Sequence, residues 1–132
     1  FMKVLVAFAS PNLSITASRF FKQAHNLRYF DKIYMYSYSE IKNDLYTEYG
    51  SNFNPKDRGY GWWCWKPLIL KKVSKKLRDG DLLYYVDSGC HLNVAGLPLM
   101  DEYEAHIRKH SLLAFQSGKS CFYRGSNRHL FW

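Results

Sequence analysis

The stretch Met2-Lys3-Val4-Leu5-Val6-Ala7-Phe8 (residues 2–8) decides the fold class. It is a short apolar run rich in β-branched residues, which predicts a buried first strand. Ser10-Pro11-Asn12 ends this run, and apolar residues then recur at helical spacing over Ser14–Asn26. That spacing predicts an amphipathic helix. A buried strand followed by a helix that can cover it favours an α/β domain.

The same alternation continues along the chain. The next predicted elements are a strand at Ile33–Tyr36, a short helix capped by Ser39 that ends at Tyr46, a loop at Gly50–Gly61, a helix at Lys66–Arg78, a strand at Leu82–Val86, a helix at Leu97–His110 and a strand at Leu112–Gln116. Leu82–Val86 is apolar throughout, which predicts a central strand. The sequence therefore predicts one α/β domain over residues 1–132, with an open, mainly parallel sheet, helices on both faces and an irregular tail at 117–132.

Composition limits the class of partner. The 132 residues are 47% hydrophobic and carry a net charge of +8, which predicts a globular domain with an anionic partner: phosphate groups, nucleic acid or an acidic membrane face. No apolar run is long enough to span a bilayer. The cysteines (Cys64, Cys90 and Cys121) are odd in number and widely spaced, so we expect no disulfide framework and a cytoplasmic protein.

The first candidate site segment runs from Arg58 to Pro67, with the sequence RGYGWWCWKP. Its glycines let the backbone approach a ligand closely, and its three Trp offer planar faces for a base or a sugar ring. Arg58 and Lys66 add positive charge suited to phosphate, and Lys66 lies at a predicted helix start that favours an anion. Alternatively, the Trp side chains anchor a long loop on the core. We expect two of them to be structural and one to face the site.

The second segment runs from Leu82 to Asn93, with the sequence LLYYVDSGCHLN. Ligands of open parallel sheets bind beyond the carboxyl ends of the strands, and Asp87 lies at such an end, as do Ser10 and Tyr36. A carboxylate there is costly unless it is paired. One partner is Mg²⁺ or Mn²⁺ carrying a diphosphate. The alternative is that Asp87 only caps the turn at Ser88-Gly89.

Together these segments, RGYGWWCWKPLILKK…LRDGDLLYYVDSGCHLN over residues 58–93, resemble the nucleotide-sugar half of bacterial glycosyltransferases with the GT-A fold. Those enzymes carry a similar Gly-Tyr-Gly-Tyr-Trp…Trp-Lys-Pro stretch, then a helix, an Asp-Gly-Asp turn and a strand ending in Asp-Ala-Gly-Cys. The resemblance implies a GT-A or Rossmann-like fold and a role in polysaccharide biosynthesis. It further implies sugar transfer from a nucleotide diphosphate, such as a UDP-sugar, to a glycan or lipid-linked acceptor.

The resemblance also implies roles for particular residues. Ala9 and Ser10 lie near the base; Arg58 and Lys66 face the diphosphate; Gly59, Tyr60, Gly61, Trp65, Ser88 and Gly89 surround the donor; and Asn93 contacts the donor sugar. Asp87 matches the first acid of the D-x-D motif that holds a metal–diphosphate complex. Gly89 stands where the second acid is usual, so Lys66 or Arg58 can neutralise the diphosphate instead of Mn²⁺ or Mg²⁺.

Enzymes of this kind are usually much longer, and their C-terminal half supplies acceptor contacts. The resemblance therefore implies a truncated or reduced enzyme, or its donor-binding core, working in the cytoplasm or at the inner membrane surface. The aromatic stretch Leu130–Trp132 favours packing against a partner, including another copy of the chain. The alternative function is a non-catalytic nucleic-acid-binding module, in which the lysines of residues 66–78 contact phosphates beside the stacking Trp side chains.

Overall fold

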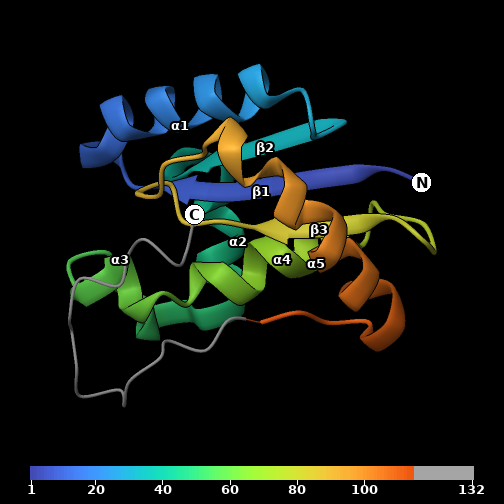
Figure 1. The fold of residues 1–132 in the computed structure, drawn as a ribbon. Coiled ribbons are helices and arrows are strands. Elements are labelled where there is room, and N and C mark those ends of the chain that lie inside the picture. The colour runs from blue at the N-terminus through green and yellow to red at the C-terminus, as the bar shows by residue number, and fades with distance from the viewer. Residues whose placement is uncertain (115–132) are drawn as a thin grey trace, which may run out of the picture.

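The computed structural model describes residues 1–114. Its elements are β1 (Lys3–Ala9), α1 (Ser14–Leu27), β2 (Lys32–Ser37), α2 (Tyr38–Tyr49), α3 (Arg58–Trp62), α4 (Trp65–Ser74), β3 (Leu82–Tyr85) and α5 (Leu97–His110), with 3₁₀ turns at Pro11–Leu13, Gly50–Asn52 and Val94–Gly96. The strands form an open parallel sheet with helices on both faces, as predicted for an α/β domain (Figure 1). No helix within residues 1–114 has the length and apolar character needed to cross a bilayer.

Two predictions concern the end of the chain. Leu112–Ala114 lie in no strand, and the rest of the predicted strand Leu112–Gln116 lies outside the described residues. The predicted irregular tail at 117–132, with its aromatic end Leu130–Trp132, also lies outside them.

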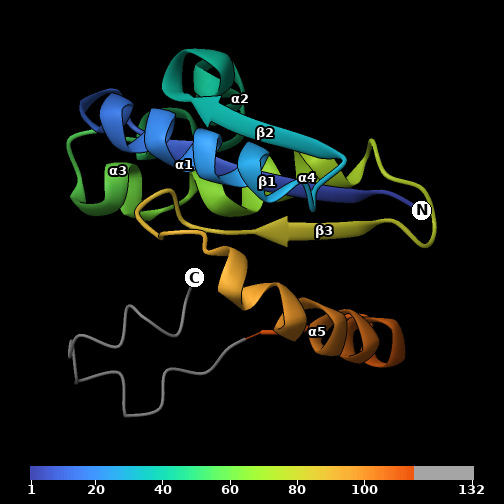
Figure 2. The same cartoon turned by 45° about the horizontal axis from the view of Figure 1, so that its top comes forward.

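The centre of the sheet is β1, with the strand order β2-β1-β3 (Figure 2). The prediction that Leu82–Val86 is central was wrong, because β3 pairs with β1 alone among the described strands. Burial explains the difference: Val4–Ala9 of β1 are all buried, whereas Leu83 and Tyr85 of β3 are half-buried. Leucine and tyrosine tolerate partial exposure, so an apolar run does not by itself identify the central strand.

Two apolar clusters hold the helices against the sheet, one on each face. The first joins β1 to α2 and α4 through Val4, Val6, Phe8, Ile41, Leu45, Trp65, Ile69 and Val73. The second joins β1 and β3 to α1 and α5 through Leu5, Ala7, Phe20, Ala24, Tyr84, Val86 and Met100. Alternate side chains of β1 therefore enter opposite clusters, as the pleat of a strand requires.

The parallel register brings the carboxyl ends of the strands to one edge of the sheet. Ala9 pairs with Ser37, and Val6 pairs with Tyr85. One further bond, from the Val86 N–H to the Val6 carbonyl (3.3 Å), holds the chain just before Asp87. α3 and the loop after β3 lie at this same edge, toward which the strand arrows point (Figure 2).

The cap of α2 is Ser37, the last residue of β2, and the prediction of Ser39 was wrong. The Glu40 carboxylate accepts a hydrogen bond from the Ser37 N–H (2.7 Å), and Ser37 and Glu40 together form a capping box. The pattern Ser-x-x-Glu at residues 37–40 carries this signal, because the glutamate must stand three residues after the cap. The helix accordingly begins earlier than predicted and continues to Tyr49.

Replacing the capping serine tests this assignment. Ser37→Ala is expected to lower the free energy of unfolding by about 1 kcal/mol, because an N–H group at the start of α2 loses its side-chain partner. Ser39→Ala, two residues away on the same helix, is the matched control and should cost less. Urea denaturation followed by circular dichroism measures both values. A larger loss in the Ser39 variant would contradict the assigned cap.

Candidate functional site

A cleft of about 550 Å³ opens at the carboxyl ends of β1 and β3. It is lined by Phe8, Ser10, Asn12 and Leu13 after β1, by Pro55, Asp57, Gly59, Tyr60, Trp63 and Trp65 around α3, and by Asp87, Ser88 and Gly89 after β3. Both candidate segments therefore meet at one place. The predicted donor-binding residues that line it are Ser10, Gly59, Tyr60, Trp65, Asp87, Ser88 and Gly89.

The other predicted site residues lie around or away from this cleft. Ala9 is buried at the end of β1, and Gly61 is buried against the Phe53 ring. Arg58 is exposed, with its guanidinium over the Trp63 ring, and Lys66 reaches the cleft through its ion pair with Asp87.

A left-handed turn shapes one wall of the cleft. Every residue from Gly59 to Trp63 has a positive φ, including the non-glycine residues of that range. The N–H groups of Tyr60 and Gly61 both donate to the Asp57 carbonyl, and the Trp63 N–H donates to the Gly59 carbonyl (3.1 Å). Such backbone is costly outside glycine and persists only where surrounding contacts enforce it. The turn replaces the end of the predicted loop at Gly50–Gly61.

The tryptophans divide differently from the prediction of two structural side chains and one facing the site. Of the three tryptophans in residues 58–67, only Trp65 is buried, at 6% exposure. Its ring packs on Phe8 with centroids 4.2 Å apart, and its indole N–H donates to the Gly59 carbonyl (3.0 Å). Trp62 and Trp63 are 64% and 41% exposed. The left-handed turn is the reason, because it directs neighbouring side chains differently from a helix or a strand.

Trp63 is the exposed tryptophan that lines the cleft. The guanidinium carbon of Arg58 lies 5.5 Å from the centre of its ring. Gly59 makes room for this ring, since a Cβ at Gly59 would stand 2.3 Å from it. The cleft thus offers an aromatic ring with a cation over it, which suits a planar ring that is joined to phosphate groups.

Asp87 is held by two side chains. Its carboxylate lies 3.1 Å from the Lys66 ammonium and accepts a short hydrogen bond from the Tyr85 hydroxyl. Burial, and then the bond to Asp87, raise the pKa of Tyr85, so this hydroxyl stays protonated and donates. The turn after β3 is closed by the backbone, from the Cys90 N–H to the Asp87 carbonyl (2.9 Å). The carboxylate therefore faces Lys66 and does not cap the turn.

The backbone amide of Lys66, at the start of α4, is already bonded and is not available to an anion. The Lys66 N–H donates to the Trp63 carbonyl (3.0 Å), and the Cys64 N–H donates to the Gly61 carbonyl (3.2 Å). Pro67 has no N–H to give. Lys66 therefore offers an anion its ammonium group and not its own N–H.

The sequence did not single out several residues that belong to this site. Asp57 and Asn12 line the cleft and bring hydrogen-bonding groups to it. Arg19 and Gln23 of α1 contact the segment after β3 from the other side. Asp57 lies in a loop without periodicity, and Arg19 resembles any polar residue of an amphipathic helix, so only the fold reveals their positions.

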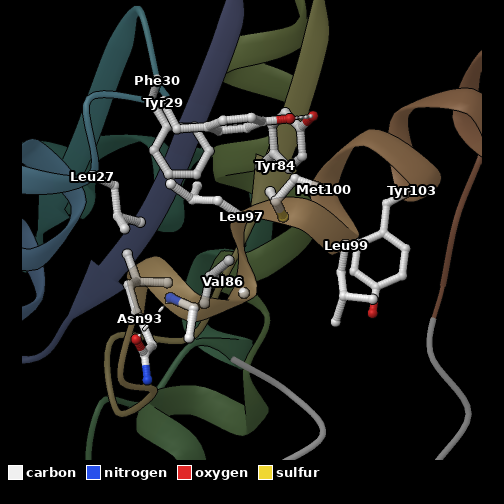
Figure 3. Close-up of a pocket in the computed structure, with 13 residues that line it drawn as sticks. Leu27, Tyr29, Phe30, Tyr84, Val86, Asn93, Leu97, Leu99, Met100 and Tyr103 are labelled. Carbon is white, nitrogen blue, oxygen red and sulfur yellow. Dashed lines mark hydrogen bonds between the residues drawn. The ribbon is translucent and has the colours of Figure 1, made fainter.

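A second cavity, of about 330 Å³, lies on the α1 face of β3 and not in the cleft (Figure 3). Its lining is apolar, and Tyr84, Leu97 and Met100 are among the residues that face it. Asn93 lines this cavity, and its side-chain carbonyl accepts the Ala95 N–H (3.0 Å). The structure therefore does not bring Asn93 together with the residues of the cleft.

Comparisons with known proteins add no relative: no protein family, curated protein or solved structure matches the chain. The function must therefore be inferred from the residues of the cleft.

The left-handed turn requires glycine at position 61, and this requirement can be tested. A Cβ there would stand 2.6 Å from the Phe53 ring, at a φ of +87°. Gly61→Ala should therefore lower the free energy of unfolding by about 1–3 kcal/mol through overpacking and backbone strain. Gly96→Ala is the matched control, because its φ is −83° and a Cβ would meet no atom within 4 Å. Equal stability of the two variants in urea would contradict the turn.

Proposed function

We propose that the cleft binds a nucleotide-diphosphate sugar, and that the chain is a glycosyltransferase, or the donor-binding core of one, with a GT-A or Rossmann-like fold. One observation carries the proposal: the Gly/Trp segment and the strand-end segment meet in a single cleft at the carboxyl ends of parallel strands. Nucleotides bind at this edge in open α/β sheets. The resemblance in residues 58–93 supports the same function.

The nucleoside would lie between the end of β1 and the left-handed turn. Trp63 offers a partly exposed aromatic face for stacking the base. Asp57 and Asn12 bring a carboxylate and an amide to the same cleft, and these groups suit the N–H and hydroxyl groups of a base and a ribose. Ser10 follows Ala9 directly and extends this polar margin.

The diphosphate would lie toward Lys66 and Arg58. The Lys66 ammonium is held at the cleft by Asp87, and the Arg58 guanidinium lies over the ring of Trp63, which lines the cleft. In sugar transfer the bond between the sugar and the diphosphate breaks, and negative charge grows on the leaving phosphate. Fixed cations stabilise that charge. Lys66 would therefore exchange part of its interaction with Asp87 for the donor.

Asp87 is also the predicted ligand of a metal ion. Asp87 would hold Mn²⁺ or Mg²⁺ only in exchange for the Lys66 ammonium, and Gly89 brings no second carboxylate. Hard cations of this kind need several oxygen ligands, which the diphosphate and water would have to complete. The donor set thus fits neutralisation by Lys66 better than metal binding, and the metal role of Asp87 stays a prediction.

The alternative function, nucleic-acid binding through the lysines of α4, has less support. The Lys72 ammonium is paired with Asp44 at 2.6 Å. Lys71 and Lys75 line a shallow pocket together with Asp44 and Glu48. Acidic side chains among these lysines weaken the attraction to a continuous phosphate backbone. A glycan or lipid-linked acceptor and an oligomer through Leu130–Trp132 stay predictions.

Calorimetric titration with UDP and UDP-sugars tests the proposal. Binding is expected with and without Mn²⁺, and Lys66→Met should weaken UDP binding about tenfold, because a charge-assisted contact to phosphate is lost. Lys71→Met, on an exposed side of the same helix, is the matched control and should bind as the unchanged protein does.

Three outcomes would count against this account. Absence of heat with every nucleotide sugar, on a folded sample, would overturn the proposed function. Binding that requires Mn²⁺ and is abolished by Asp87→Asn would restore the metal role. Tight binding of single-stranded DNA with a steep salt dependence would favour the nucleic-acid alternative.

A further inference from the structure

Side chains on one face of α1 hold the segment that follows β3 through hydrogen bonds. The Arg19 guanidinium donates to two backbone carbonyls of that segment, of Ser88 (2.9 Å) and of Cys90 (2.7 Å). It also donates to the side-chain carbonyl of Gln23 (2.8 Å), one helical turn further on. That Gln23 carbonyl accepts the Leu92 N–H as well (3.1 Å). Two side chains of one helix thus fix alternate residues of a segment that lies beyond the sheet's hydrogen bonds.

The direction of the Ser88 carbonyl sets the direction of the next amide. The peptide bond between Ser88 and Gly89 is trans, so the Gly89 N–H points opposite to the Ser88 carbonyl. Because that carbonyl points at Arg19, the Gly89 N–H points away from α1. Gly89 is exposed and lines the cleft. Within residues 1–114 its N–H donates to no other residue.

Charge makes this amide a stronger donor. A carbonyl bound to a guanidinium withdraws electron density from its peptide group, and chains of hydrogen bonds strengthen one another in this way. The Gly89 amide therefore combines a fixed direction, an exposed position and increased acidity. Backbone amides with these properties bind phosphate and other oxyanions.

We infer that Arg19 is a positioning residue which aims the Gly89 N–H into the cleft, where that N–H donates to an oxygen of the donor's diphosphate. Arg19 itself stays on the α1 side and touches no donor atom. The inference rests on the proposed function and deepens it, because it names a contact that neither Asp87 nor Lys66 provides. It also gives glycine a role where the second acid of a D-x-D motif is usual.

Amide spectra of the ¹⁵N-labelled chain, recorded during titration with UDP, test the inference. The Gly89 amide proton is expected to move downfield on binding, as a new hydrogen bond to phosphate requires. Arg19→Lys keeps the charge but cannot hold two carbonyls in a planar fork. This variant should weaken UDP binding about tenfold and largely remove the Gly89 shift. Lys22→Gln, which removes an exposed charge from the same helix, is the control and should change neither.

The possible results separate the two proposals. Shifts at Ser10 and Gly59 without a shift at Gly89 would overturn the inference and leave the proposed function standing. An equal Gly89 shift in the unchanged protein and in Arg19→Lys would overturn the role of Arg19. Absence of any shift at the cleft would overturn both. The measurement on the unchanged protein decides the first and last cases even if the variant does not fold.

Discussion

The structure depends on the pairing of β1 with a parallel strand on each side. Val4 to Ala9 are buried, and their side chains alternate between two apolar clusters that hold α1 and α5 on one face and α2 and α4 on the other. Because both neighbours run parallel to β1, the chain leaves every strand at the same edge of the sheet. Residues far apart in sequence, such as Ser10 and Asp87, therefore meet in one cleft.

Two local structural features complete that cleft. The left-handed turn at Gly59–Trp63 buries Trp65 against Phe8 and leaves Trp63 exposed at the cleft. Hydrogen bonds from Arg19 and Gln23 hold the segment after β3 against α1. In this segment Gly89 lines the cleft and Asn93 lines the apolar cavity. The sheet is held by many backbone hydrogen bonds, whereas both of these features depend on single side chains and single backbone angles. The shape of the site should accordingly be more sensitive to substitution than the fold.

Hydrophobic periodicity predicted the parallel sheet and its covering helices, because burial on one face or two leaves a regular trace in the sequence. It did not predict which strand is central, since Leu83 and Tyr85 are apolar yet half-buried. It placed Ser10 and Asp87 at the edge of the sheet where the cleft opens, because strand ends can be located from the sequence. Asn93, predicted for the same site, lines the apolar cavity instead. The exposure of Trp63 at the cleft and the hydrogen bonds from Arg19 to the segment after β3 could not be predicted. Positive φ angles at non-glycine residues and contacts between distant segments leave no periodic signal.

The most direct test of the central claim is a crystal structure of the chain with a bound UDP-sugar. The account predicts the base against Trp63, the ribose near Asp57 and the diphosphate between Lys66 and the Gly89 N–H. Electron density for the nucleotide in the apolar cavity beside Tyr84, or on the lysines of α4, would contradict it. Density in the cleft with a metal ion on Asp87 would keep the site and change the group that neutralises the diphosphate.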